Sequence, residues 1–162
     1  MASLTEGERW ALTTYWNLFA HRHQKIPEFA PDGRDWTTWL LLGGRGAGKT
    51  RAGAEWVKQM AQANVSPIAL IGETEHDVRE VMIEGVSGLM AAHGSYERPD
   101  WSPSRRRLVF SNGSVAQAFS AEDPESLRGP QFAAAWCDEL AKWKRAGETV
   151  GKYRGNVPLA DR

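Results

Sequence analysis

Apolar residues recur at helical spacing in some parts of the chain and form short uninterrupted runs in others. Between Leu4 and Ala20 they recur every three to four residues, and Ser3 and Glu6 have the spacing of a capping box. Together these features predict an N-terminal helix. The following residues, 21–35, contain two prolines and a glycine and predict a connecting loop.

Three apolar runs, Thr37–Leu42, Ile68–Ile71 and Gln131–Cys137, have the length and composition of buried strands. Helical patterns follow the first two runs, over about Ala52–Ala63 and from Thr74 onward. Strands that alternate with helices indicate an α/β domain with a mainly parallel sheet flanked by helices.

The helix that begins at Thr74 has clear start and stop signals. Thr74 and Asp77 have capping-box spacing, whereas Gly85 and Gly88 weaken the later turns. We expect one side of this helix to face the core through its apolar residues, which are Val78, Val81, Met82 and Val86.

A hairpin is predicted further along, because residues 108–111 and 114–117 flank Asn112-Gly113, the strongest short-range hairpin signal. Just before it, Arg105–Arg107 form a basic cluster, with Arg98 and Trp101 nearby. Two interpretations are open: a contact with a DNA backbone, or a solvated hairpin base. The shortness of the cluster and the neutral charge of the chain favour the second.

The segment Gly43–Thr50 (GGRGAGKT) matches the phosphate-binding pattern G-x-x-x-x-G-K-[ST] at every fixed position. Its glycines allow backbone conformations that a Cβ forbids, so that N–H groups can turn toward phosphate oxygens. The helix that follows adds its N-terminal partial positive charge. Lys49 is expected to reach the β- and γ-phosphates, and the Thr50 hydroxyl to bind Mg²⁺. The alternative is a glycine-rich turn with a coincidental Lys-Thr pair.

Two carboxylates, Asp138 and Glu139, end the third apolar run. Asp138 is expected to hold Mg²⁺ and Glu139 to polarise an attacking water, since neighbouring side chains on a strand point in different directions. The alternative is a solvated helix N-terminus, whose dipole two acids complement. Cys137, within the run, is expected to be a small buried apolar residue.

Two arginines are candidates for stabilising the charge that develops during phosphoryl transfer. Arg45, inside the glycine-rich segment, either folds back on the γ-phosphate or is an exposed loop arginine. Arg128 lies in a turn-rich approach to the acidic strand. It either serves the nucleotide of a neighbouring subunit or pairs with Glu122, Asp123 or Glu125.

Composition narrows the class of protein. The chain has 162 residues, enough for one domain, and its 20 Lys+Arg balance 20 Asp+Glu, which excludes a polybasic protein that grips nucleic acid over its whole surface. No apolar run is long enough to span a bilayer, and Cys137 is the one cysteine, so no internal disulfide can form. We therefore expect a soluble protein of the cytoplasm.

Three stretches together resemble the ATPase of the large terminase subunits of tailed phages and gene transfer agents. They are Trp36–Trp56 (WTTWLLLGGRGAGKTRAGAEW), Ser120–Gly129 (SAEDPESLRG) and Trp136–Trp143 (WCDELAKW), in the family's order. The resemblance implies a P-loop NTPase fold of the additional-strand, catalytic-glutamate type with a β-hairpin insertion. It also implies an ATP-driven motor that threads double-stranded DNA into a preformed capsid in a bacterial host cell.

The resemblance further implies cofactors, site residues and partners. ATP and Mg²⁺ are the expected cofactors, with Thr50 and Asp138 on the metal. Catalytic roles are implied for Lys49, Glu139, the loop arginine Arg45 and, in trans across a ring of subunits, Arg128. The implied partners are double-stranded DNA, the portal protein, the small terminase subunit and further copies of the chain. The implied nucleotide-binding residues are Gly43, Gly44, Arg45, Gly46, Ala47, Gly48, Lys49, Thr50 and Arg51.

The chain departs from the family after Trp143. There the family continues with a coupling strand and a nuclease domain, whereas Lys144–Arg162 is basic and glycine-rich and predicts a solvated tail. We divide the chain into an N-terminal helix and loop (1–35), a P-loop ATPase core (36–143) and a divergent basic tail (144–162). We expect a C-terminally incomplete ATPase without nuclease activity. The alternatives are a non-catalytic remnant that binds nucleotide or packaging partners, and a helicase-like ATPase.

Overall fold

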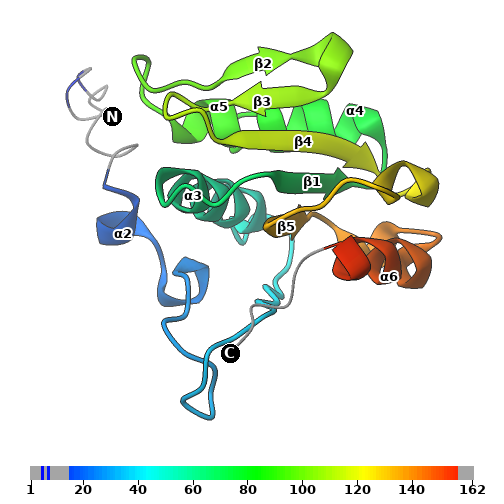
Figure 1. Ribbon diagram of the computed structural model, residues 1–162. Coiled ribbons are helices and arrows are strands. Elements are labelled where there is room, and N and C mark those ends of the chain that lie inside the picture. Colours follow the sequence, from blue (N-terminus) through cyan, green and yellow to red (C-terminus); the bar gives the residue numbers. More distant parts are fainter. Residues whose placement is uncertain (1–4, 6, 8–14, 157–162) are drawn as a thin grey trace.

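The computed structural model describes residues 5, 7 and 15–156, which form an α/β fold around a five-stranded sheet (Figure 1). The strands are β1 (Ile68–Gly72), β2 (Asp100–Ser102), β3 (Arg107–Val109), β4 (Val115–Ser120) and β5 (Ala134–Cys137). Their order in the sheet is β2-β3-β4-β1-β5. β1 pairs in parallel with β4 and β5, whereas β2 with β3 and β3 with β4 pair antiparallel. The sheet is therefore mixed.

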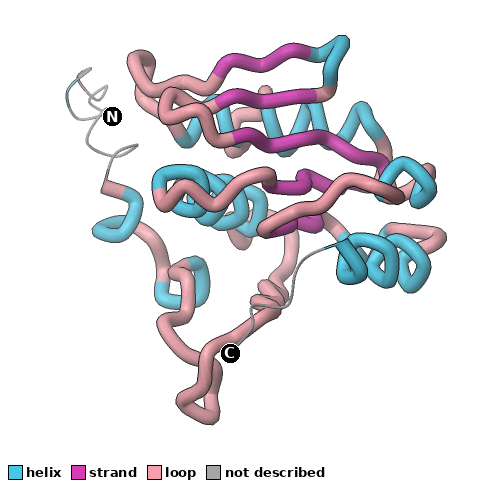
Figure 2. Tube along the Cα trace, in the orientation of Figure 1, coloured by secondary structure: helices cyan, strands magenta, loops and turns pink. Residues whose placement is uncertain are grey.

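Helices connect these strands (Figures 1 and 2). The α-helices are α2 (Trp16–Phe19), α3 (Lys49–Gln62), α4 (Glu75–Asp77), α5 (Leu89–Ala92) and α6 (Ala146–Asn156), and a π-helix, Val78–Ile83, continues α4. Short 3-10 turns occupy Arg22–Gln24, Pro103–Arg105, Pro124–Leu127 and Leu140–Lys142. Among the residues with a described placement, no helix has the length and apolar character that a membrane span requires.

The core lies on both faces of the sheet, and β1 shows why. All five of its residues are buried. Ile68 and Leu70 belong to an apolar cluster with α3, the π-helix and α5, whereas Ala69 and Ile71 belong to a second cluster that packs against Trp143 and α6. Successive side chains of a strand point to opposite faces, so a strand covered on both faces needs an uninterrupted apolar run.

Most of the elements predicted from the local pattern are confirmed. α3 follows the glycine-rich segment, β1 occupies the second apolar run, and β5 occupies the end of the third. The Asn112-Gly113 hairpin joins β3 to β4, with Gly113 in the left-handed region at φ 86°. The prediction of a mainly parallel sheet is confirmed only in part: β1 pairs in parallel with β4 and β5, but this hairpin and the β2–β3 turn add one antiparallel pairing each.

The helix at Thr74 starts as predicted but ends early. Thr74 and Asp77 form a reciprocal capping box. Val78 and Met82 are buried, yet Val81 is 41% and Val86 96% exposed, so the expectation that all four apolar residues face the core was wrong. Val81 lies within the π-helix, which ends at Ile83. The wider turn of a π-helix changes the direction of its side chains, and Val81 faces away from the core.

The first predicted strand is absent. No residue of Thr37–Leu42 belongs to a strand, and Leu40 and Leu42 are 65% and 80% exposed. Figure 2 draws this part of the chain as loop. A strand forms only where its backbone N–H and C=O groups pair with a neighbouring strand. β5 is the last strand on this side of the sheet among the described residues, and Thr37–Leu42 does not pair with its outer edge.

The two ends of the chain also differ from the sequence predictions. Most of the predicted helix Leu4–Ala20 lies outside the described residues, and of its described part Gly7 and α2 are helical. The prediction of a solvated tail after Trp143 was wrong for the start of that segment. There α6 packs against the turn Pro124–Leu127, and its Thr149 is fully buried and donates to the Ala121 carbonyl.

Candidate functional site

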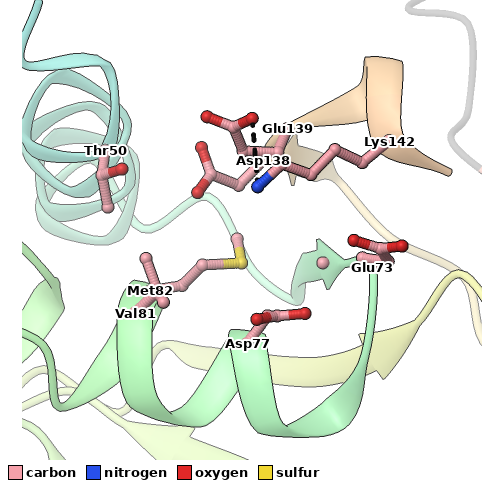
Figure 3. Close-up of a pocket in the computed structure, with 9 residues that line it drawn as sticks. Thr50, Glu73, Asp77, Val81, Met82, Asp138, Glu139 and Lys142 are labelled. Carbon is pink, nitrogen blue, oxygen red and sulfur yellow. Dashed lines mark ion pairs between the residues drawn. The ribbon is translucent and has the colours of Figure 1, made fainter. Parts of the chain in front are cut away.

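A pocket of about 150 Å³ lies at the carboxyl ends of β1 and β5, beside the N-terminus of α3 (Figure 3). Because β1 and β5 run in parallel with Ile71 opposite Cys137, the residues that follow each strand emerge side by side. The carboxyl edge of parallel strands is where α/β proteins commonly bind ligands. The pocket is lined by Thr50, Gly72, Glu73, Asp77, Val81, Met82, Asp138, Glu139 and Lys142.

The glycine-rich segment leads into α3 as a tight loop. Gly46 and Gly48 have φ of 81° and 73°, in the left-handed region that favours glycine, and Gly48 is the N-cap of α3. The Lys49 ammonium donates hydrogen bonds to the carbonyls of Gly43 and Gly44, at 2.9 and 3.0 Å. The lysine side chain is therefore folded back over its own loop.

A segment far upstream holds this loop, and the sequence analysis missed it. The buried Gln24 side chain donates from Nε2 to the Ala47 carbonyl at 3.1 Å, and His23 Nε2 lies 3.4 Å from the same oxygen. A Cβ on Gly48 would lie 2.2 Å from Gln24 Nε2, so any other residue at this position would displace the Gln24 side chain from the loop. Nothing in the local sequence pattern of residues 21–24 signals this contact.

Asp138 follows β5 and is buried, with 9% of its surface exposed. Burial raises the pKa of its carboxyl group, and the negative charge of Glu139 raises it further. The positive charge of Lys49 and a hydrogen bond from Thr50 act in the opposite direction and lower this pKa. A buried carboxylate with a lysine, a hydroxyl and a second carboxylate around it is suited to hold a cation.

Glu139 lies at the mouth of the pocket between two lysines. Its carboxylate is 3.8 Å from the Lys49 ammonium. It is also 3.5 Å from the Lys142 ammonium, a pair that Figure 3 shows. Its backbone has φ 53°, a left-handed conformation that costs a non-glycine residue roughly 1–2 kcal/mol. Trp143 supports this turn from the core, because its indole N–H donates to the Asp138 carbonyl at 3.1 Å.

Two more acids line the pocket and were not singled out as site residues. The Asp77 carboxylate accepts hydrogen bonds from the backbone N–H and hydroxyl of Thr74, which gives it a helix-capping role. Glu73 directly follows β1, so the rule for carboxyl edges could have identified it. Within residues 5, 7 and 15–156, no three His, Cys, Asp or Glu side chains cluster closely enough to form a metal site by themselves.

The predicted arginines lie in different environments. Arg45 is exposed on the loop. Arg51 instead turns along α3, where its guanidinium pairs with Glu55 at 2.7 Å and lies over the Trp16 ring. Arg128 is exposed and pairs with Glu125 at 3.1 Å, one of the three partners expected for it. The structure thus brings together Lys49, Thr50, Asp138 and Glu139, and neither Arg45 nor Arg128 pairs with them.

Comparison with known proteins gives one family. Residues 40–154 match the model of the family described as "Terminase large subunit, T4likevirus-type, N-terminal". The matched range covers most of the chain and includes the glycine-rich loop, the acidic strand end and most of α6. No curated protein and no solved structure matches the chain.

Proposed function

The chain belongs to the T4-like terminase large subunit family, as its N-terminal region, and we propose that this region binds and hydrolyses ATP to drive double-stranded DNA into a capsid. Membership in this family gives the chain a general role in phage DNA packaging, with DNA and packaging proteins as partners. The proposal adds a P-loop NTPase fold and the use of Mg²⁺-ATP at the pocket between β1, β5 and α3. The portal protein, the small terminase subunit and further copies of this chain are its proposed partners.

The observation that carries the proposal is the meeting of Lys49 with Asp138 and Glu139. These residues are far apart in the sequence, yet the Lys49 ammonium is 3.8 Å from the Glu139 carboxylate, and its charge lowers the pKa of Asp138. A lysine at a helix N-terminus, in a loop of left-handed glycines, is the arrangement that phosphate groups need. Residues Gly43–Arg51 are the proposed nucleotide contacts.

Mg²⁺ fits the donor set beside this loop. Asp138 is buried and accepts a hydrogen bond from the Thr50 hydroxyl, so the two side chains offer adjacent oxygen ligands of the kind that Mg²⁺ prefers. A bound cation would also balance the buried negative charge of the Asp138 carboxylate. Since no larger acidic cluster is present among the described residues, phosphate oxygens and water have to complete the shell. When bound, Mg²⁺ would neutralise negative charge on the phosphates.

Glu139 is the proposed group that orients and deprotonates the attacking water. Its position beside Asp138 leaves it at the pocket mouth rather than on the metal, and Lys49 keeps it near the phosphate loop. We assign Arg45 to the stabilisation of transition-state charge in cis and Arg128 to the same role toward a neighbouring subunit. Arg45 is free to turn inward because it lies exposed on the loop, and Arg128 is presented at the surface.

The test is Mg²⁺-ATP binding and turnover by the chain and two variants. Lys49→Ala should abolish binding, whereas Glu139→Gln should retain binding and lose turnover by about 10²- to 10⁴-fold. Lys144→Ala and Glu28→Gln, which change exposed residues of the same charge, are the matched controls. Unchanged binding in Lys49→Ala would overturn the assignment of the site.

A second function, nucleotide binding without turnover, is favoured by one specific observation. The segment that enters the phosphate loop, Thr37–Leu42, is not part of the sheet, so the loop lacks the strand that would hold it rigidly against β5. Binding that depends on Lys49, together with no phosphate release from the unmodified chain, would select this function.

A further inference from the structure

We propose that the turn between β2 and β3, residues Pro103–Arg107, is a binding site for the phosphodiester backbone of double-stranded DNA. This proposal rests on the proposed function in one respect, namely that duplex DNA is the substrate. It adds which surface of the chain binds the duplex. The turn lies apart from the nucleotide pocket and shares no lining residue with it.

The turn presents three consecutive arginines to solvent. Arg105, Arg106 and Arg107 are all exposed, as are Pro103 and Ser104 beside them. Neither Arg105 nor Arg107 pairs with a carboxylate of the described part of the chain, so two guanidinium groups project with their charge unbalanced. Guanidinium groups bind phosphates through two parallel hydrogen bonds, and each phosphate neutralised on a duplex releases condensed counterions.

The backbone of the turn is fixed, which favours a defined contact over a mobile one. Arg106 adopts a left-handed conformation at φ 51°, and its N–H donates to the Pro103 carbonyl at 3.1 Å. Its own carbonyl accepts from the Ala118 N–H at 2.9 Å and so ties the turn to β4. A turn that only contacts solvent does not require an arginine with a left-handed backbone that is hydrogen-bonded to β4, as Arg106 is.

The direction of the strands places this turn at the carboxyl edge of the sheet, where the nucleotide pocket also lies. β2 runs toward the turn and β3 away from it, antiparallel to β4, so the turn lies at the end of β4 that carries Ser120. Figure 1 shows the β2–β3 connection at the same end of the strands as α4. Three strand spacings separate β3 from β5, or about 14 Å. A duplex held at the turn would therefore lie near the nucleotide.

Glu75 is a built-in competitor for this site. Its carboxylate pairs with the Arg106 guanidinium at 2.5 Å, and both side chains are about half exposed. Glu75 is the first residue of α4, which also carries Asp77 of the nucleotide pocket. DNA phosphate at the turn would take Arg106 from Glu75, so that the two anions exclude each other.

The first experiment measures binding of a fluorescent duplex by anisotropy as a function of salt. Arg105→Ala/Arg107→Ala should reduce the slope of log affinity against log salt by about 1.8, since each phosphate contact contributes about 0.9. Between about 200 and 50 mM salt the unmodified chain should then gain about tenfold more affinity than this variant. Arg105→Lys/Arg107→Lys should keep most of the slope. Lys25→Ala/Arg34→Ala, which removes two exposed charges upstream of the glycine-rich loop, is the charge-matched control.

The second experiment uses Glu75→Gln, which keeps the side-chain shape and removes the competing charge. If the turn binds phosphate, this variant should bind the duplex more tightly, with about threefold more affinity gained between 200 and 50 mM salt. An unchanged slope in Arg105→Ala/Arg107→Ala, a slope equally reduced in the control, or no salt-dependent DNA binding by the unmodified chain would each overturn the proposal. So would weaker binding by Glu75→Gln.

Binding of a fluorescent ATP analogue separates this proposal from the proposed function. Both sites recognise phosphate, but the two assignments use different residues. Arg105→Ala/Arg107→Ala should leave the affinity for the analogue unchanged, and Lys49→Ala should leave the salt slope for DNA unchanged. Loss of analogue binding in the arginine variant would show that the turn serves the nucleotide and would overturn the DNA assignment.

Discussion

Gly53, in the middle of α3, tests the packing that holds the glycine-rich loop beside the acidic strand end. A Cβ at this position would lie 2.2, 2.3 and 2.5 Å from three atoms of the Trp136 indole ring. Trp136 belongs to β5, two residues before Asp138, and is 7% exposed in the core. Since α3 begins with Lys49 and Thr50, this contact sets how closely those residues approach Asp138.

The expected effect of Gly53→Ala is the difference between two terms. Helix propensity alone favours alanine by about 1 kcal/mol. Overpacking a filled core costs about 1–3 kcal/mol, and contacts this short with a rigid, buried ring place the cost at the upper end. The free energy of unfolding should therefore fall by about 2 kcal/mol, which for a domain of this size lowers the Tm by about 4–8 °C.

Urea unfolding followed by circular dichroism measures this difference, with Gly151→Ala as the matched control. Gly151 lies in α6, and a Cβ there would meet no atom within 4 Å, so helix propensity alone should raise the stability by about 1 kcal/mol. If Gly53→Ala stabilises the chain as Gly151→Ala does, then α3 does not pack on Trp136 as described. The distances at the candidate site would then be wrong as well.

Three further predictions concern the supports of the site and the core. Trp143→Phe removes the hydrogen bond to the Asp138 carbonyl and part of a buried ring, so urea unfolding should show a loss of at least about 1 kcal/mol; no loss would refute the role of this bond. Gln24→Ala should speed hydrogen exchange of the loop amides around Ala47 while Gln59→Ala, on α3, leaves it unchanged; equal rates would refute the clamp. Burial lowers the pKa of His93 from 6.5, so the folded chain disfavours its charged form. The stability it contributes is therefore complete above about pH 6.5 and is lost as the pH falls toward the lowered value, and His93→Gln should flatten the Tm profile in this window.

The sequence predicted those elements whose signals are local. Asn112-Gly113 predicted the β3–β4 hairpin because its turn, closed by a hydrogen bond from the Gly113 N–H to the Phe110 carbonyl, needs a residue at positive φ, which glycine supplies. The run Ile68–Ile71 predicted β1 because a strand buried on both faces must be apolar throughout. The helix after the glycine-rich loop and the capping box at Thr74 are equally local features.

The candidate site was predictable as a set of residues but not as an arrangement. The order of a phosphate loop, a strand and an acidic strand end implied that Lys49 and Glu139 would meet, and they lie 3.8 Å apart. The left-handed backbone of Glu139 and its second partner, Lys142, depend on the turn that Trp143 fixes, which no local pattern encodes. The catalytic roles themselves stay predictions.

The segment Thr37–Leu42 shows that an apolar sequence pattern does not by itself predict strand pairing. Its apolar run is as continuous as that of β1, yet Leu40 and Leu42 are exposed and no strand includes them. An apolar run records that side chains favour burial, but a strand forms only where a second strand satisfies its backbone, and that partner is a property of the whole sheet. No strand precedes the glycine-rich loop among the described residues, and on its upstream side the loop is instead held by side-chain contacts such as the hydrogen bond from Gln24 to the Ala47 carbonyl.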